Sequence, residues 1–597
     1  MYAERIESLR AMMRSRGWDA VVLTGSDPHA SEYPAPRWKQ VEWLTGFTGE
    51  AGDVVVTLDH AGLWTDTRFF LAAKEQLAGT GVELHKMRVP EQVPIPQWLA
   101  SRFEDDDPVI AIDSLCQDCS SAAALDEAFG GAPHAIVGVP DLLDTLWKDR
   151  PAIPQTPVSV LDDAAAGISR ESKILWIRQF LENKGCDGIL LSALDEIAWM
   201  LNVRASDIDY NPYVISYLLV MQDRVCWFVL KEPMDDPTTD GTFDLLSSEG
   251  IELLPYADTA VFLSQEFEGR LFLDPASMNL HLREAIRDAG TEVSEERSPV
   301  VLRKAIKTPA EIDGMRRAHV EDGLAMEQFL YWLETSLERG CRITERDAAL
   351  KLGSLRASID GYRGDSFETI SAYGPGAALP HYVTPSNDAP VLERHGLYLC
   401  DSGGHYLFGT TDITRTVPLG ACTPLEREDY TLVLKGHIDL AKAVFPRGTA
   451  GCQLDVLARG PLWLSKRNFG HGTGHGVGFW LGVHEGPQDI RQNFNQQPLL
   501  PGMVTSDEPG IYREGMHGVR HENLLLCTEA GVNDFGDWLR FETLTMCHFD
   551  TSVLEVRLLD ESERKWLNDY NKRVYETLAG RLPAEVAAWL RKKTAAV

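Results

Sequence analysis

The chain has 597 residues, and its 57 Lys and Arg against 89 Asp and Glu give a formal net charge of -32 at pH 7. That length exceeds what a single hydrophobic core supports, so we expect two to four domains. A field of this sign repels phosphate backbones and anionic lipid, so we expect no nucleic-acid and no membrane partner. The N-terminal stretch lacks the apolar segment of a signal peptide, and no apolar run is long enough to span a bilayer.

The ten cysteines are scattered without a disulfide framework, which is typical of a reducing compartment and predicts a cytoplasmic protein. Cys116 and Cys119 form one isolated CxxC pair. Because no second pair accompanies it, we predict ordinary thiols there and no zinc site.

Residues 1–152 are predicted to form an α/β domain. An opening helix carries Ile6, Leu9, Met12 and Met13 on one face and ends at Gly17. The strand AVVLT follows, then the paired strands VVVTL and AGLWTD, and then a helix in TRFFLAAKEQL. A proline-rich stretch at 150–157 is a candidate linker to the next domain.

Residues 153–307 repeat that order and are predicted to form a second α/β domain related to the first. The helix ISRESKILWIRQFLENKG is again followed by a strand, GILLSAL, and by the paired strands VISYLLVM and VCWFVL. The junction Gly185-x-Asp187 repeats Gly17-x-Asp19. Duplication of one domain is the physical interpretation.

Residues 308–545 are predicted to form an α+β unit in which helices cover a curved antiparallel sheet. Thr308 with Glu311, and Thr344 with Asp347, have the spacing of capping boxes. Residues 546–597 add a helical extension whose helix is capped by Asp560. Its apolar face is expected to pack on this unit or to share a dimer contact, and it consists of Trp566, Leu567, Tyr570, Val574 and Leu578.

Two aspartates in the string CDSGGHYLFGTTDITRT are the first candidates for chemistry. Asp401 and Asp412 flank a glycine-bearing turn between strand-like segments, so we expect a hairpin whose arms bring both carboxylates together. Two ionised carboxylates side by side repel each other unless a cation lies between them. The pair therefore indicates a metal site.

Three histidines and two glutamates follow in glycine-rich and strand-like segments. Glycines around His475 in GHGTGHGVG would allow a close approach of backbone and imidazole to a metal or substrate. Glu508 precedes Pro-Gly and is expected to end a strand. Glu522, in VRHENLLL, is expected in a strand, with Arg520 as an alternative partner for its charge.

The number of donors decides how many metals are expected. Asp401, Asp412, His475, Glu508 and Glu522 offer too many ligands for one tetrahedral zinc. Bridging carboxylates hold two ions roughly 3.5–4 Å apart, as in two-metal hydrolases. An oxygen-rich site favours Mn²⁺, with Co²⁺ or Zn²⁺ as alternatives.

The order Asp, Asp, His, Glu, Glu with these strings resembles the pita-bread metallopeptidases of family M24. The strings DSGG…GTTDITRT, GHGTGHGVG…VHEGP and DEPGIY resemble the long, three-domain Xaa-Pro aminopeptidases (aminopeptidase P). SDPHASEY and WTDTRFF extend the resemblance to the N-terminal region. It implies two creatinase-type N-terminal α/β domains followed by a pita-bread catalytic domain, and commonly a homodimer.

The resemblance also implies an activity and residue roles. The family removes an N-terminal residue that precedes proline, commonly with manganese. Asp401 would bind the first metal, Asp412 and Glu522 would bridge, and His475 and Glu508 would complete the second site, with Glu508 as proton acceptor. Residues that match substrate-binding or transition-state groups are His381, His471 and His484, and Arg68 matches one that reaches the peptide from the first domain. This chain departs from the family in HYVTP and in Phe479-Trp480.

Two alternatives stay open at this point. One keeps the fold but changes the substrate, as in prolidases that cleave Xaa-Pro dipeptides or in creatinase-like hydrolases. The other is a non-catalytic binding protein of the same fold, against which the complete ligand set argues.

Overall fold

The computed structural model describes residues 1–104, 106–230 and 241–597. They form two compact units, one made of Met1–Leu161 with Ile168–Val300 and the other of Asp162–Gly167 with Val301–Val597. The domain boundaries expected from the sequence stay a prediction. Within the described residues, no helix has the length and apolar character needed to cross a membrane.

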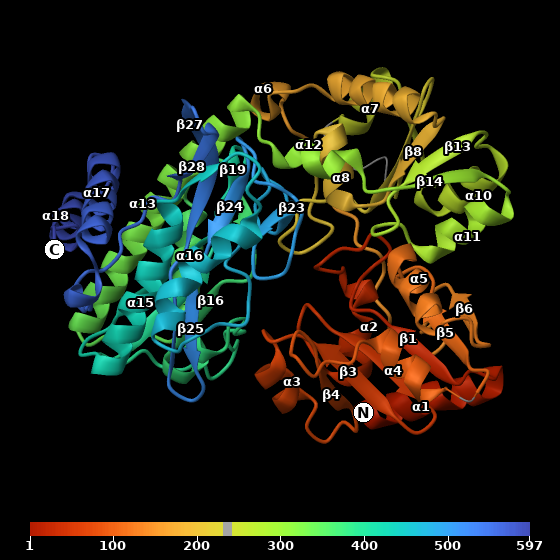
Figure 1. Cartoon of the computed structure of the whole chain (residues 1–597), viewed down its shortest axis with the longest axis horizontal. Helices are drawn as coiled ribbons and strands as arrows, with labels where there is room; N and C mark the ends of the chain where they lie inside the picture. The colour runs from red at the N-terminus through yellow and green to blue at the C-terminus, as the bar shows by residue number, and fades with distance from the viewer. Residues whose placement is uncertain (105, 231–240) are drawn as a thin grey trace. The chain divides into compact units, whose positions relative to one another are not determined.

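The first half of the N-terminal unit is a six-stranded sheet in the order β4-β3-β2-β1-β5-β6 (Figure 1). Its strands are β1 Ala20–Leu23, β2 Asp53–Thr57, β3 Ala61–Thr65, β4 Glu83–Lys86, β5 Val109–Asp113 and β6 Ala135–Val139. The opening helix is α1 Tyr2–Arg16, and Gly17 ends it with φ 68°, a left-handed conformation that glycine adopts without strain. The predicted helix in TRFFLAAKEQL is shorter than expected, α3 Phe70–Gln76.

The second half repeats this sheet strand for strand, in the order β12-β11-β10-β8-β13-β14. The strands are β8 Gly188–Leu191, β10 Ser216–Met221, β11 Val225–Val229, β12 Ile251–Pro255, β13 Arg270–Leu273 and β14 Glu292–Glu295. Each neighbouring pair has the same parallel or antiparallel sense as its counterpart in the first sheet. The predicted duplication is therefore confirmed at the level of topology.

A buried histidine from SDPHASEY joins the two copies. His29 is 1% exposed, and its Nδ1 lies 2.8 Å from the Ser192 carbonyl oxygen while its Nε2 lies 2.9 Å from the Tyr256 hydroxyl. Asn279, which belongs to the second copy, donates a hydrogen bond of 2.9 Å to the Pro28 carbonyl oxygen of the first. Because buried polar groups need partners, this string serves the packing of the two copies.

The second unit contains the helices α13 Pro309–Glu338 and α14 Glu345–Arg356, and both have the capping boxes that the sequence predicts. Its largest sheet runs β21-β28-β27-β24-β22-β23 and is antiparallel throughout. Those strands are β21 Val444–Pro446, β22 Gly474–Gly476, β23 Glu485–Ile490, β24 Val504–Asp507, β27 Asn523–Asn533 and β28 Gly536–Thr543. Helices α15 Pro424–Ala441 and α16 Gly451–Leu464 pack against each other beside it (Figure 1).

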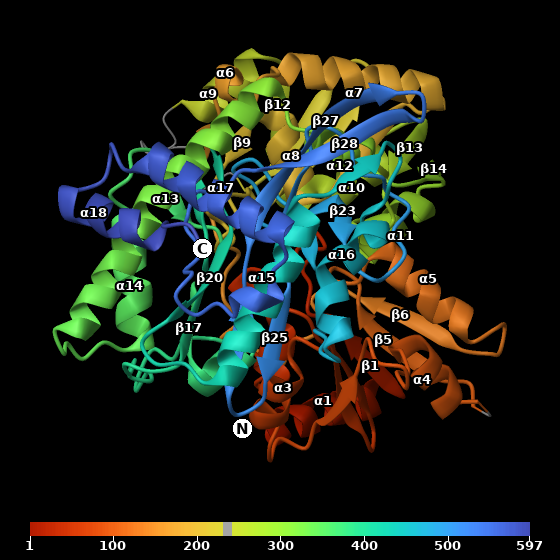
Figure 2. The ribbon, with the colours of Figure 1, turned by 60° about the vertical axis from the view of Figure 1, so that its left-hand side comes forward.

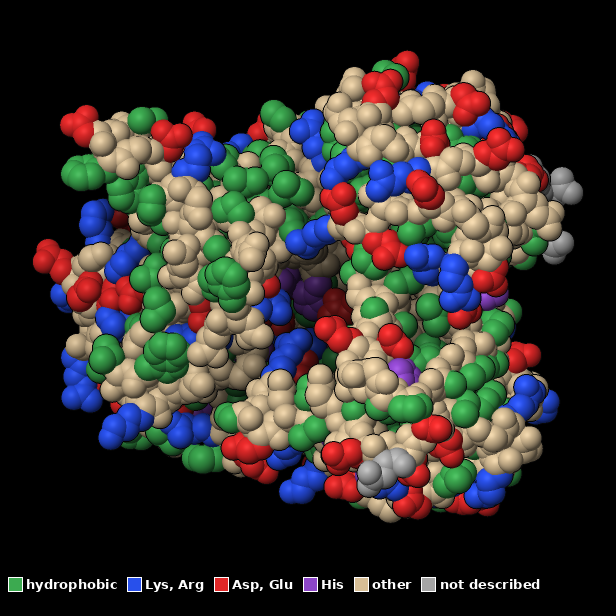
Figure 3. All heavy atoms as spheres, turned by 45° about the vertical axis from the view of Figure 1, so that its right-hand side comes forward, with side chains coloured by type: hydrophobic (Ala, Val, Ile, Leu, Met, Phe, Trp, Pro, Cys, Tyr) green, Lys and Arg blue, Asp and Glu red, His purple; other side chains and the backbone are tan. Residues whose placement is uncertain are grey.

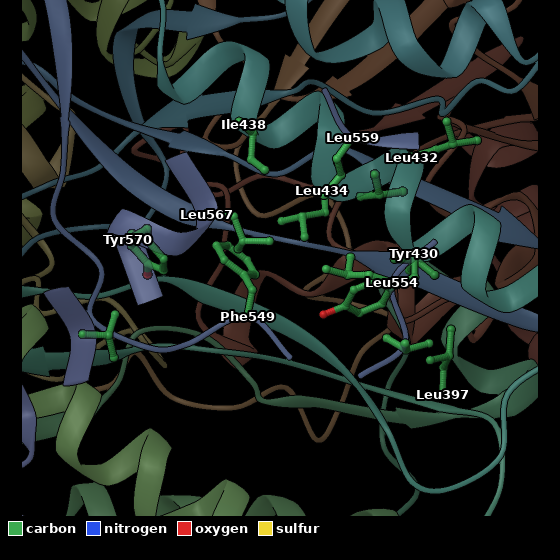
Figure 4. Packing of buried hydrophobic residues seen from close by; sticks show 14 of the residues in the cluster. Leu397, Tyr430, Leu432, Leu434, Ile438, Phe549, Leu554, Leu559, Leu567 and Tyr570 are labelled. Atoms are coloured by element: carbon green, nitrogen blue, oxygen red, sulfur yellow. The ribbon is translucent and has the colours of Figure 1, made fainter. Parts of the chain in front are cut away.

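The C-terminal helices α17 Glu561–Leu578 and α18 Ala584–Lys593 lie beside α13 (Figure 2). Leu567, Tyr570, Val574 and Leu578 are buried with α15 residues in one core (Figure 4). Burial of each large apolar side chain contributes about 1.5–3 kcal/mol. The expected packing of this helix on the second unit is confirmed.

Charged side chains of both signs are interspersed over the visible face of each unit (Figure 3). All ten cysteines are free thiols within the described part of the chain, and Cys116 is buried. The interpretation of the CxxC pair as ordinary thiols without zinc stays a prediction.

Candidate metal centre

Of the two aspartates, Asp401 lies on one arm of the expected hairpin and Asp412 lies just before the other. Strands β17 Leu397–Ser402 and β20 Ile413–Pro418 pair antiparallel, with Asp401 opposite Thr414, and Asp412 directly precedes β20. Both aspartates are buried. Burial, and then the charge of Asp412, raise the pKa of Asp401, so the two carboxylates act on each other.

His475 and Glu508 come from the large sheet and meet Asp412. His475 lies on β22 and Glu508 follows the last residue of β24, as its Pro-Gly sequence predicts. The His475 Nε2 atom is 3.5 Å from Asp412 Oδ2 and 3.4 Å from Glu508 Oε1. Asp412, His475 and Glu522 each place one ligand atom within 4.8 Å of the others.

The glycines around His475 are needed for strand packing. A Cβ added at Gly474 would overlap the Ser506 carbonyl oxygen, and one at Gly476 would overlap that of Glu485. Glycine at both positions lets the neighbouring backbones approach and so fixes the imidazole between them. The close approach that these glycines permit here is between neighbouring backbones, and the expected approach to a metal or substrate stays a prediction.

Glu522 lies between two strands, so its predicted place inside a strand is wrong. Strand β26 ends at Arg520 and β27 begins at Asn523. The Glu522 amide instead donates to the Thr414 carbonyl at 3.1 Å, and its carboxylate accepts from the Thr414 hydroxyl at 2.9 Å. This break in the ladder attaches Glu522 to the aspartate hairpin.

Arg520 is the partner of Asp401, so its suggested pairing with Glu522 is also wrong. The Arg520 Nε atom lies 3.0 Å from Asp401 Oδ2, and Nη2 contacts the same oxygen. Arg520 Nη1 donates to the Tyr512 hydroxyl at 2.7 Å. Tyr512 belongs to DEPGIY, but a tyrosine inside a strand gave no signal of this role.

The electrostatics of the cluster are those of a cation site. Burial, followed by mutual repulsion, raises the pKa of Glu522 well above its usual range, and burial raises that of Glu508 to about 7. Asp401 Oδ1 and Glu522 Oε1 are buried without a hydrogen-bond partner among the described residues. Unpaired carboxylate oxygens are costly in a protein interior, and divalent cations would satisfy them.

The remaining predicted histidines lie around this cluster. The His484 ring is 4.4 Å from that of His475, centroid to centroid. His471 Nε2 is 2.7 Å from the Tyr512 hydroxyl, and burial, then the charge of Arg520, lower its pKa well below the usual value. His381 also acts electrostatically on His471, and Arg520 Nη2 donates to the adjacent Pro380 carbonyl at 3.3 Å.

Arg68 lies in the N-terminal unit, where its guanidinium pairs with Asp66 at 2.8 Å. Its approach to a peptide stays a prediction. One of the departures from the family is Phe479, which is buried. Its ring packs on helix α13, because a Cβ added at Gly314 of that helix would lie 2.9 Å from a Phe479 ring carbon.

Two supporting groups were missed by sequence reasoning. Glu485, next to His484, is buried between the ammonium groups of Lys304 and Lys307. Glu345 accepts from the Tyr382 hydroxyl at 2.7 Å and so holds the residue beside His381. The partners of Glu485 and Glu345 lie far from them in the sequence, so no local sequence pattern predicts these contacts.

Family comparisons agree with this architecture. A model described as "Metallopeptidase family M24" matches residues 313–529, and one for the "C-terminal region of peptidase_M24" matches 537–597. Models described as "Creatinase/Prolidase N-terminal domain" match residues 5–146 and 149–311. The fold class predicted from the sequence, two such α/β domains before a pita-bread domain, is confirmed.

Full-length relatives make the relationship specific. "Probable Xaa-Pro aminopeptidase P" of Laccaria bicolor is 38% identical over 612 residues, which cover 99% of this chain and 93% of the relative. The protein of the same name from Coprinopsis cinerea is 37% identical and is covered to 98%. The chain belongs to metallopeptidase family M24, in the branch of the Xaa-Pro aminopeptidase P proteins.

Solved structures support the same assignment. The X-prolyl aminopeptidase from Caenorhabditis elegans, described as a cytosolic enzyme with a di-nuclear active site, has a TM-score of 0.94 and 34% identity, with 100% of both chains covered. The Xaa-Pro dipeptidase from Bacillus anthracis has a TM-score of 0.51 and 25% identity, and the match covers 64% of this chain.

Proposed function

We propose that this chain is an aminopeptidase that hydrolyses the bond between the N-terminal residue of a peptide and a following proline. The observation that carries the proposal is the cluster of Asp412, His475 and Glu522, whose ligand atoms lie within 4.8 Å of one another beside Asp401 and Glu508. Relatives along the whole chain named Xaa-Pro aminopeptidase support the substrate class.

Two divalent ions fit these residues, since burial and the neighbouring carboxylates raise the pKa of Glu522, and Asp401 Oδ1 and Glu522 Oε1 have no hydrogen-bond partner among the described residues. Asp401 would hold the first ion, His475 and Glu508 the second, and Asp412 and Glu522 would bridge. When bound, such ions lower the pKa of a bound water and polarise a carbonyl. An oxygen-rich donor set with one imidazole favours Mn²⁺, with Co²⁺ or Zn²⁺ as alternatives.

The chain's own groups divide the remaining work. The Glu508 carboxylate accepts the proton of the attacking water. His381, His471 and His484 orient the peptide and the oxygen that gains charge, and the lowered pKa of His471 makes it a neutral imidazole. The role of Arg68 toward the peptide, which the family resemblance implies, stays a prediction.

Proline explains why a dedicated enzyme is needed. The Xaa-Pro amide carries no N–H, and the ring fixes φ of the proline. A site for this bond therefore needs a shaped proline pocket and a group that recognises the free amine. We further infer a cytoplasmic homodimer. The description of the Caenorhabditis elegans enzyme as cytosolic supports the location.

The decisive experiment measures activity and metal content on the same preparation. The purified chain, stripped with chelator and reloaded with Mn²⁺, is expected to release the first residue of an Xaa-Pro-Pro peptide and to leave Xaa-Ala-Pro intact. The stripped chain should be inactive. An Xaa-Pro dipeptide is expected to react much more slowly, and preference for the dipeptide would instead indicate a prolidase. No release by a chain that holds two metals would refute the activity.

A further inference from the structure

We propose that His60, His85 and Glu83 form a separate site for one late first-row divalent cation, such as Zn²⁺, on the first sheet of the N-terminal unit. One ligand atom from each of the three lies within 4.8 Å of the others. These residues are not part of the carboxylate cluster of the catalytic unit, and the inference does not depend on the proposed peptidase activity.

The strand register gathers the three side chains on one face. Strands β3 and β4 are parallel, with Gly62 opposite Glu83 and Trp64 opposite His85. Because side chains alternate along a strand, Glu83 and His85 point to the same side of β4. His60 lies in the turn before β3, two residues ahead of Gly62, and continues the same face.

Gly62 provides the space that this arrangement needs. A Cβ added there would lie 2.7 Å from His85 Cδ2, 2.8 Å from His60 Nε2 and 2.7 Å from a Trp64 ring carbon. Its backbone is not left-handed, so no turn demands glycine here. The absence of a side chain at residue 62 is therefore what lets the two imidazoles meet.

The ring nitrogens have the separation that a tetrahedral ion requires. His60 Nε2 lies 3.2 Å from His85 Nε2. Two Zn–N bonds of about 2.0–2.1 Å to one ion would span an angle of about 100–106° across that distance, close to tetrahedral. Two imidazoles and one carboxylate with a water is a donor set that zinc takes in proteins.

The surroundings fix the imidazoles and leave the carboxylate mobile. Trp64 stacks on His85 with ring centroids 3.8 Å apart, and Trp98 lies 5.0 Å from the His60 ring. Glu83 Oε2 is 3.8 Å from His60 Nδ1, and its side chain is 69% exposed, so the carboxylate has room to rotate toward an ion held by the two imidazoles. An ion here would link the turn before β3 to β4, which is the edge strand of the sheet.

The test isolates this site by disabling the catalytic cluster. In the full chain carrying Asp412→Asn and Glu522→Gln, titration with Zn²⁺ alone at pH 7.5 is expected to show one tightly bound ion per chain and a higher midpoint of thermal unfolding. Adding His60→Asn and His85→Asn should abolish both effects. Adding His134→Asn instead is the matched control, because His134 pairs with an exposed aspartate in the same domain and should leave both unchanged.

Two results would overturn the site. One is an absence of tightly bound Zn²⁺ in the chain with the disabled catalytic cluster. The other is binding that survives the His60 and His85 substitutions, since the ion then lies elsewhere. If the variant with the added His60→Asn and His85→Asn substitutions does not fold, Glu83→Gln in the chain with the disabled catalytic cluster replaces it as the test. Loss of that one ligand should weaken Zn²⁺ binding at least about 10-fold. Unchanged affinity there would also contradict the proposal.

Discussion

Arg520 donates two hydrogen bonds to the same oxygen of Asp401, Oδ2, and the other oxygen, Oδ1, is buried without a partner among the described residues. The guanidinium thus orients one carboxylate oxygen and leaves the second for a cation. The same guanidinium reaches the Tyr512 hydroxyl, which in turn contacts His471. One side chain therefore connects a proposed metal ligand to a proposed substrate group.

Replacing Arg520 should destabilise the metal-free chain far more than the metal-loaded one. In Arg520→Gln, Asp401 loses its buried partner, which typically costs about 3–5 kcal/mol. Bound cations would offset part of that loss. Urea unfolding of both forms measures the difference, and Arg316→Gln, which breaks an exposed pair with Glu542, should cost less than about 1 kcal/mol. Equal losses in the two forms would contradict this role.

Removing one of the proposed bridging carboxylates should lower activity and raise the stability of the metal-free chain. Asp412→Asn or Glu522→Gln is expected to lower turnover at least about 100-fold, because the ions lose a shared ligand. The metal-free variant should be more stable than the metal-free parent, since one member of a group of buried carboxyl groups that disfavour one another's ionisation is gone. Turnover and thermal unfolding on the same samples test both statements. Asp439→Asn, which alters a surface pair with Lys442, serves as control.

The Lys304–Glu485–Lys307 cluster predicts an order of stabilities. Glu485→Gln leaves two buried ammonium groups without their shared carboxylate and should cost about 3–5 kcal/mol. Lys307→Met leaves one paired lysine and glutamate and should cost less. Because Glu485 follows His484, its substitution should also lower kcat. Urea unfolding and steady-state kinetics test the order, and a larger loss in Lys307→Met would reverse it.

Glu345 predicts a pH dependence of stability. Burial raises its pKa from 4.5 to about 7 in the folded chain. The folded state therefore binds more protons than the unfolded state between these values, so its contribution weakens as pH rises from about 4.5 to 7 and is constant above. The limiting slope for one proton is about 1.4 kcal/mol per pH unit.

Glu345→Gln should remove that slope. The difference in unfolding free energy between parent and variant is expected to change between pH 5 and 7 and to be flat above pH 8. Since Glu345 also holds Tyr382 beside His381, KM for the peptide should rise in the variant. A difference that does not vary with pH would show that Glu345 is not protonated in the folded chain.

The sequence by itself determined whatever depends on neighbours along the chain. The capping boxes of Thr308 with Glu311 and Thr344 with Asp347 require only a spacing of three residues, and both are present. The duplicated sheet follows from hydrophobic patterns that occur twice. The candidate ligands were also identifiable, because carboxylates and imidazoles among glycines and β-branched residues are unusual unless something satisfies them.

Only the tertiary structure decided which charges meet. Arg520 is two residues from Glu522 in sequence but pairs with Asp401, 119 positions away, while the Glu522 carboxylate accepts from Thr414. The partners of Glu485 and the meeting of His60 with His85 across Gly62 likewise depend on strand register and on the space between side chains. Such pairings arise from the folding of distant segments, and no local pattern encodes them.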